Sequence, residues 1–175
     1  MKSYDWSTLR AARSATKVPD AVITLQNAKT DDAAENASCK IENTVVVQGM
    51  LYESAVPTAS LLLSALSLCT SAARPKILEL LVQIGSGETA PLEIEIGNFD
   101  LAKRCRQEVC RGFSVYKEAF SNAGNEELCW CIDLLGLCSL ENQARRAEVE
   151  LLFSALLLKP VDKDTRQLVE NWMRE

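Results

Sequence analysis

Apolar residues recur at helical spacing along almost the whole chain. The clearest stripe has steps of four residues with one step of three: Leu101, Cys105, Val109, Phe113, Tyr116 and Phe120. Apolar side chains three and four residues apart share one face of an α-helix, so each such stripe predicts a helix with one buried face. Nine segments are expected to be helical: about 5–14, 19–27, 31–48, 57–69, 74–84, 99–120, 126–138, 142–158 and 165–173.

Prolines mark the beginnings of several of these segments. Pro19, Pro57 and Pro75 each stand where a helix can begin, because the first helical turn leaves the N–H that proline lacks without a partner anyway. The pair Val18-Pro19 returns as Val56-Pro57, and a period near forty with two helices per unit is typical of HEAT and armadillo repeats. We therefore expect an all-α fold with about nine helices in antiparallel pairs, forming a right-handed HEAT- or armadillo-like stack. The alternative is a compact, irregular helical bundle.

One domain is expected to span residues 1–175. A chain of this length, with 47% apolar residues, buries enough surface to fold without disulfides or metals. Within it, residues 1–85 form the more regular HEAT-like half, and residues 98–175 form a less regular helical half.

One segment breaks the helical rhythm. Residues 91–97 alternate apolar and acidic side chains with period two, which is the pattern of a strand or an extended segment. On this pattern the three apolar side chains would lie against the body of the protein, while Glu93 and Glu95 would point outward. Residues 86–100 are therefore expected to form an extended acidic arm on the helical scaffold.

The net charge of -5 is concentrated in this arm. Four acidic residues stand there without any Lys or Arg, whereas the rest of the chain is almost balanced in charge. Two interpretations remain open: a solvated loop that is acidic by chance, or a negative contact surface whose field speeds association with a basic partner. The acidic balance argues against a nucleic-acid partner, because such binding depends on Lys and Arg contacts to phosphates.

The residue types present offer little catalytic chemistry. The sequence has no histidine, which excludes Ser–His and Cys–His nucleophile pairs and HExxH zinc sites. Cys105, Cys131 and Cys138 fall on apolar helix faces, so they are expected to be core residues rather than metal ligands. Glu93 and Glu95 on an exposed arm would both stay ionised, which a general acid cannot do. We expect no enzyme activity, no metal and no cofactor.

The expected location is cytoplasmic. Residues 1–10 lack the apolar core of a signal peptide. The longest mostly apolar run, Ala55–Cys69, is too short and too polar to span a bilayer, so no membrane partner is expected.

A pattern of apolar and turn positions runs through about residues 5–85. It comprises Trp6, Leu9, Ala12, Val18-Pro19, Ile23, Leu25, Glu42–Gly49, Tyr52, Ala55–Pro57, Arg74-Pro75 and Leu78–Leu81. In these positions the chain resembles small bacterial HEAT-like proteins, which are similar to immunity proteins of polymorphic or type VI secretion toxins. The resemblance implies a cytosolic protein without catalytic residues that binds and blocks one cognate toxin. It carries over no functional residue, since such families share a scaffold and vary the contact surface.

These observations combine into one hypothesis: a bacterial immunity protein that blocks the active site or substrate access of a toxin with a basic surface or cleft. The expected contact residues are Glu88, Glu93, Glu95 and Asp100, helped by Asp31, Asp32, Glu35, Glu42 and Tyr52. One alternative is a cytosolic HEAT-like scaffold or adaptor with no toxin partner. Another is a HEAT-like DNA glycosylase, which would need a basic groove facing DNA.

Overall fold

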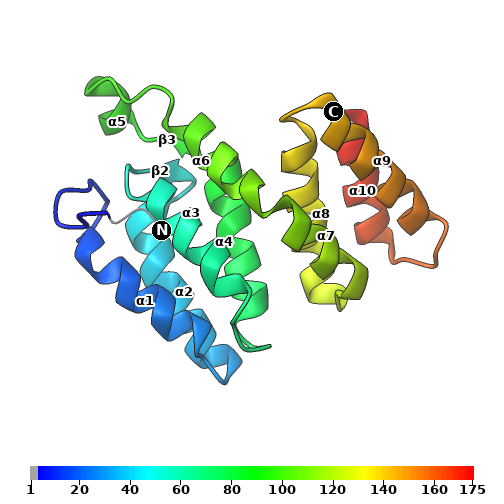
Figure 1. Ribbon diagram of the computed structural model, residues 1–175, viewed down its shortest axis with the longest axis horizontal. Coiled ribbons are helices and arrows are strands. Elements are labelled where there is room, and N and C mark those ends of the chain that lie inside the picture. Colours follow the sequence, from blue (N-terminus) through cyan, green and yellow to red (C-terminus); the bar gives the residue numbers. More distant parts are fainter. Residues whose placement is uncertain (1–3) are drawn as a thin grey trace.

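Helices account for most of the chain in the computed structural model, which describes residues 4–175, and the all-α class is confirmed (Figure 1). The helices are η1 (Ala15–Lys17), α1 (Val18–Gln26), α2 (Asp31–Val45), α3 (Ala55–Leu66), α4 (Arg74–Ser86), α5 (Pro91–Glu95), α6 (Leu101–Val109), η2 (Cys110–Gly112), α7 (Phe113–Asn122), α8 (Asn125–Ser139), α9 (Gln143–Leu157) and α10 (Lys163–Arg174).

Three two-residue strands form a small sheet at the end of α2. They are β1 (Val46–Val47), β2 (Met50–Leu51) and β3 (Glu88–Thr89). Strand β2 pairs antiparallel with β1 and parallel with β3, in the order β1-β2-β3. Gln48 and Gly49 join β1 to β2, both at positive φ, which matches the twist of a two-residue hairpin loop. The hairpin ends α2 at Val45, three residues before the predicted end of that helix.

Polar side chains fix the beginnings of three helices. The Thr30 hydroxyl accepts a hydrogen bond from the Ala33 N–H at the start of α2. Asn142 caps α9 in the same way, and the Asp162 carboxylate accepts from the Thr165 N–H at the start of α10. Each cap gives a partner to an N–H group that the first helical turn leaves without one.

Helices joined by short loops pack against each other, and each pair contacts the next. Helix α1 packs on α2, α3 on α4, α7 on α8, and α9 on both α8 and α10. Contacts of α1 with α3 and of α2 with α4 join the first two pairs, and α4 with α8 joins the two halves of Figure 1. The buried apolar side chains form one contiguous cluster that extends from Val18 to Val169. The HEAT or armadillo type and the handedness of the stack stay predictions.

The predicted helix over residues 5–14 is wrong, because polar contacts hold this segment in another conformation. The Asp5 carboxylate accepts from the N–H and hydroxyl of Ser7, a local turn that competes with helix formation. Further along, the Ala12 N–H donates to the Thr44 carbonyl oxygen, and the Arg10 carbonyl oxygen accepts from a backbone N–H at the start of α3. Residues 4–14 therefore form an N-terminal strap that crosses from α3 to α2.

The predicted single helix over residues 99–120 is also wrong, because it breaks at η2. The Val109 carbonyl oxygen accepts a hydrogen bond from the Tyr116 hydroxyl at 2.8 Å, instead of from the Phe113 N–H as in a continuous helix. The Phe113 N–H turns to the Cys110 carbonyl oxygen instead. At Gly112, a Cβ atom would lie 2.5 Å from the Tyr116 ring, so the buried tyrosine occupies the space that a side chain would need.

Trp172 makes a close contact between helix α10 and α8. The Trp172 Nε1–H donates to the Asp133 carboxylate at 2.8 Å, and the indole lies on Gly136 so closely that a Cβ atom there would be 2.1 Å from Trp172 Cδ2. The contact requires glycine at position 136, because any side chain would displace the indole.

We therefore expect Gly136→Ala to lower the free energy of unfolding by about 1–3 kcal/mol, as overpacking of a filled contact does. Urea unfolding followed by circular dichroism measures the change. Gly124→Ala is the matched control, since a Cβ atom at Gly124 would meet nothing within 4 Å. Equal effects of the two substitutions would contradict the assigned contact.

Candidate functional site

The segment predicted to be an extended acidic arm is a short helix. Glu93 and the apolar residues lie opposite to the prediction, whereas Glu95 is exposed as expected. Pro91 starts α5, and Gly97 ends the turn with φ of 88°. The Glu93 side chain is fully buried. The apolar residues instead lie outside, with exposed fractions of 53% for Leu92, 44% for Ile94, 51% for Ile96 and 72% for Phe99. The expectation that Glu93 points outward as a contact residue is therefore wrong.

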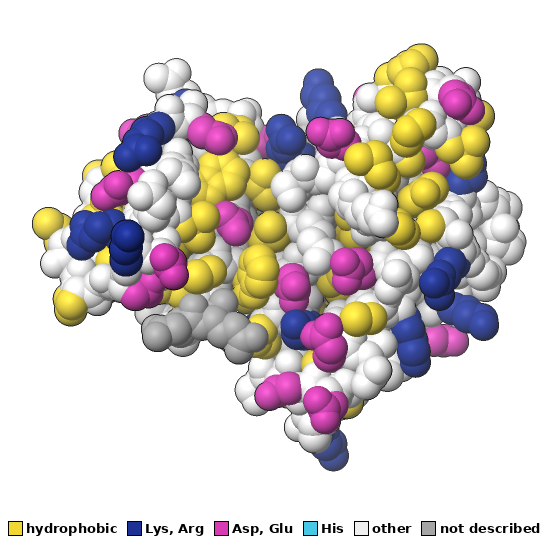
Figure 2. Space-filling model, turned by 180° about the vertical axis from the view of Figure 1, so that it is seen from behind, with side chains coloured by type: hydrophobic (Ala, Val, Ile, Leu, Met, Phe, Trp, Pro, Cys, Tyr) yellow, Lys and Arg dark blue, Asp and Glu magenta, His cyan; other side chains and the backbone are white. Residues whose placement is uncertain are grey.

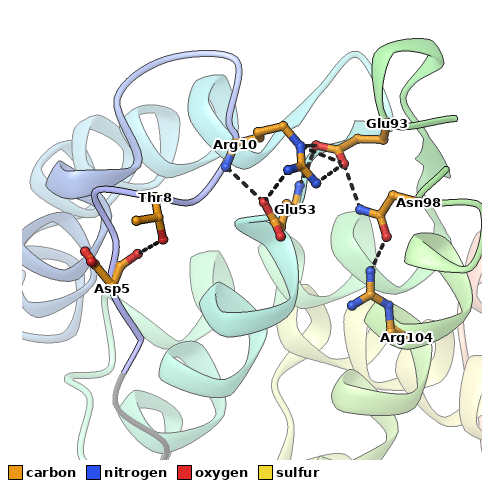
Figure 3. A network of polar contacts seen from close by, with 7 residues as sticks. All are labelled: Asp5, Thr8, Arg10, Glu53, Glu93, Asn98 and Arg104. Carbon is orange, nitrogen blue, oxygen red and sulfur yellow. Dashed lines mark hydrogen bonds and ion pairs between the residues drawn. The ribbon is translucent and has the colours of Figure 1, made fainter. Parts of the chain in front are cut away.

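Glu93 is buried because several N–H groups converge on its carboxylate (Figure 3). Arg10 donates from Nε at 3.2 Å and from Nη2 at 2.9 Å. The Asn98 side-chain amide donates at 2.7 Å, and the Glu53 backbone N–H donates at 3.1 Å. Arg10 also forms an ion pair with the Glu53 carboxylate at 3.1 Å, and Arg104 donates to Asn98 Oδ1, which sets the orientation of that amide. We call this group, Arg10, Glu53, Glu93 and Asn98, the carboxylate clamp.

The clamp determines the protonation of Glu93. Burial alone would raise the pKa of Glu93, but the hydrogen bonds from Arg10, Asn98 and the Glu53 N–H, with the charge of Arg10, hold it below its ordinary value of 4.5. The hydrogen bond to Glu93 in turn raises the pKa of Arg10. Both groups are charged at neutral pH, so the clamp is a partly buried ion pair that ties α5 to the strap and to the start of α3.

Backbone contacts hold the chain on either side of α5. The Glu88 N–H donates to the Gly49 carbonyl oxygen at 2.9 Å, and the Ala90 N–H donates to the Leu51 carbonyl oxygen at 3.0 Å. After α5, the backbone N–H of Ala102 in α6 donates to the Thr89 hydroxyl of β3. Helix α5 therefore projects from two fixed ends, at the upper left of Figure 1.

The exposed side chains of α5 and of the turn after it are mostly apolar, with acidic residues among and beside them. We call Leu92, Ile94, Ile96 and Phe99 the α5 patch. Figure 2 shows hydrophobic side chains gathered over this part of the molecule, at the upper right. Glu88, Glu95 and Asp100, three of the predicted contact residues, are exposed next to the patch in the sequence. Asp100 forms an ion pair with Arg104 at 3.2 Å, whereas no ion pair involves Glu88 or Glu95 within the described part of the chain.

A second group of predicted contact residues lies at the opposite end of α2. Asp31 and Asp32 are exposed in its first turn, about 22 Å along the helix axis from the sheet that carries α5. Glu35 forms an ion pair with Lys76 of α4 at 2.6 Å, and the hydrogen bond with Lys76 lowers the pKa of Glu35. The structure therefore does not bring these three residues together with the acidic residues near α5.

Glu42 and Tyr52, the remaining predicted contact residues, are half-buried. Glu42 lies near the end of α2, and its carbonyl oxygen accepts from the Val46 N–H. Tyr52 lies between β2 and α3, directly before Glu53 of the carboxylate clamp, and its N–H donates to the Val45 carbonyl oxygen. Of the two, Tyr52 is directly linked along the chain to the site around α5.

The residues that organise this site were missed by sequence reasoning. Arg10 lies 83 positions before Glu93 in a segment predicted to be helical, and no local pattern connects the two residues. One indirect signal existed: residues 86–100 contain four carboxylates and no cation, so a buried acid there had to find its partner in another segment.

The described part of the chain offers few other candidates for a reactive or metal-binding site. All seven cysteines are free thiols, and burial raises the pKa of Cys105 and Cys131 to about 12, which keeps them as unreactive thiols. Among residues whose positions are described, no three His, Cys, Asp or Glu side chains gather to hold a metal ion. The helices within residues 4–175 include none with the length and apolar character needed to cross a membrane.

Comparison with known proteins finds no relative of this chain. No family model, curated protein or solved structure matches this chain.

The clamp predicts how stability depends on pH. Because the folded-state pKa of Glu93 lies below its ordinary value, the stability that it contributes is complete above pH 4.5 and is lost as the pH falls through the folded-state pKa. We expect Glu93→Gln to lower the free energy of unfolding at neutral pH by about 1–3 kcal/mol, because it replaces the charged acceptor of several hydrogen bonds and leaves Glu53 as the remaining carboxylate paired with Arg10. Half-exposure of Arg10 favours the lower end of this range.

Urea unfolding at a series of pH values tests this prediction. The loss of stability in acid should be smaller for Glu93→Gln than for the unmodified protein. Glu95→Gln, which neutralises an exposed carboxylate on the same helix, should retain the original pH dependence. A Glu93→Gln variant with unchanged stability at neutral pH and an unchanged acid profile would show that the clamp contributes nothing.

Proposed function

We propose that this chain is a non-catalytic protein-binding module whose contact surface is the α5 patch, and that it neutralises a toxin with a basic surface or active-site cleft. The observation that carries the proposal is the orientation of α5, which buries a carboxylate while four large apolar side chains of the helix and the turn after it are exposed.

This orientation is costly unless a partner covers the patch. Burial of a large apolar side chain contributes about 1.5–3 kcal/mol, and the four residues of the α5 patch forgo roughly half of this or more at each position. An isolated exposed apolar residue is ordinary, but several on one projecting turn are typical of an interaction site. A partner that buries these side chains gains the free energy of apolar burial that folding alone does not provide.

The acidic residues beside the α5 patch favour a basic partner. Glu88 and Glu95 are exposed, and no ion pair within the described residues offsets their charge. Protein interfaces commonly have an apolar centre and a polar rim, and opposite charges across the rim speed association. The α5 patch with Glu88 and Glu95 matches this arrangement for a cleft with apolar walls and Lys or Arg at its edge.

The shape of the site supports inhibition by occlusion. Helix α5 projects from the body between two fixed ends, so it can enter a cleft without unfolding. An inhibitor of this kind needs complementarity and slow dissociation rather than chemistry. The resemblance of residues 5–85 to HEAT-like immunity proteins favours a secreted toxin as the target and a cytoplasmic site of action.

We expect Phe99→Ala and Leu92→Ala each to weaken binding to the toxin about tenfold to a hundredfold, as loss of a central apolar anchor does. Proteins encoded by neighbouring genes are first tested for binding to this chain in a pull-down. A protein that binds is then co-expressed with the chain to test whether growth is rescued. Affinities of the variants for the captured protein are then measured by surface plasmon resonance. Charge reversal of Glu88 and Glu95 should mainly slow association, with less effect at high salt.

Leu158→Ala is the control, because Leu158 is a highly exposed apolar residue after α9, in the other half of the molecule. It should leave affinity unchanged. Equal binding by Phe99→Ala, Leu92→Ala and Leu158→Ala would exclude the α5 patch as the contact surface. Binding through the patch without rescue of growth would support a protein-binding module but contradict the toxin as its partner. The chain would then be a scaffold or adaptor.

A further inference from the structure

A groove lined by basic residues lies on a different surface, between η1–α1 and α2. It encloses about 610 Å³ and is lined by Arg13, Lys17 and Lys40, with Asp20 as its one carboxylate. Ligand sites for small molecules commonly enclose about 300–1,000 Å³. We call these four residues and the space between them the basic groove.

The charge of the basic groove is opposite to that of the whole chain. Three cations and one carboxylate line it, in a protein with a net charge of -5. None of the ion pairs among the described residues involves Arg13, Lys17 or Lys40, whereas Arg10, Arg104 and Lys76 are all paired with carboxylates. The three cations therefore remain free to bind an anion.

Segments distant in the sequence bring these cations together. Arg13 lies near the end of the N-terminal strap, Lys17 ends η1, and Lys40 lies in α2. The Thr44 carbonyl oxygen accepts from the strap at the Ala12 N–H, and the Thr44 hydroxyl donates to the Lys40 carbonyl oxygen. These contacts hold the backbone that carries Arg13 on the same end of α2 as Lys40, so the groove is formed before any ligand arrives.

The floor and walls of the groove suit a small organic anion. Val18, Ala21 and Ala37 supply apolar surface, and Ser14 supplies a hydroxyl group, whereas the Thr24 hydroxyl donates to the Asp20 carbonyl oxygen. Arg and Lys are the residues that most often bind phosphate oxygens, Arg through paired donors and Lys as a point charge. A nucleic acid is disfavoured, because its affinity grows with many phosphate contacts along an extended basic surface and here the cations are confined to one concavity.

We propose that the basic groove binds a phosphate-bearing small molecule of nucleotide size, with a di- or triphosphate on Arg13, Lys17 and Lys40 and its organic part on the apolar floor. The proposal is independent of the partner at α5, since it rests on different residues.

Isothermal titration calorimetry with inorganic pyrophosphate and with ATP tests it. Binding should be saturable, weaken as salt is raised, and be tighter for ATP, because the organic part adds apolar contact. Lys17→Ala and Lys40→Ala should each weaken binding about threefold to fivefold, the range of one partly exposed ion pair. Asp20→Asn should tighten binding by a similar factor, because it removes the one repelling carboxylate.

Lys29→Ala and Lys159→Ala are the matched controls, since both lysines are exposed and lie outside the groove. They change the net charge equally and should leave both affinities unchanged, as should Phe99→Ala in the α5 patch. Two results would overturn the proposal: no saturable binding of either probe, or equal weakening by Lys29→Ala and Lys17→Ala, which would show general attraction of anions. Equally tight binding of citrate would also overturn it, because the site would then select charge rather than phosphate.

Discussion

The buried carboxylate of Glu93 is the group on which the exposed surface of α5 depends. A charge removed from water costs several kcal/mol unless it is paired and hydrogen-bonded. Here Arg10, Asn98 and the Glu53 N–H supply that compensation. A single helical turn cannot point neighbouring side chains the same way, so an inward Glu93 leaves Leu92 and Ile94 outside. Polar contacts, rather than apolar burial, therefore orient this helix.

The same strap that supplies Arg10 also helps to form the basic groove. Its Ala12 N–H is bound to the Thr44 carbonyl oxygen, and Arg13 lines the groove directly afterwards. Both proposed binding surfaces thus depend on a segment without regular secondary structure that is fixed by contacts to α2 and α3. The rigid helices carry these surfaces, while the irregular segments determine which side chains they present.

Much of the helical framework was predictable, because it is encoded locally. Apolar stripes placed α1–α4 and α8–α10 within a few residues, and caps such as Thr30 are recognisable from residue type and position. The strap, the break at η2 and the orientation of α5 were not predictable in the same way. Each depends on a polar partner from another part of the chain or from the next turn: Thr44 for the strap, Tyr116 for η2 and Arg10 for α5. Period-two alternation in residues 91–97 predicted an extended segment with both glutamates outward. In the helix that forms instead, Glu93 turns inward to Arg10, 83 positions before it, while Glu95 is exposed together with the apolar residues.

Hydrogen–deuterium exchange of the backbone amides in residues 91–99 tests the central claim most directly. If the carboxylate clamp holds α5 in place, Arg10→Gln should speed exchange in this segment at neutral pH while α8 keeps its protection. The substitution removes the charge that compensates the buried Glu93 and leaves the sequence of α5 intact. Unchanged exchange in residues 91–99 would show that other contacts hold the helix and that its exposed apolar side does not depend on Glu93.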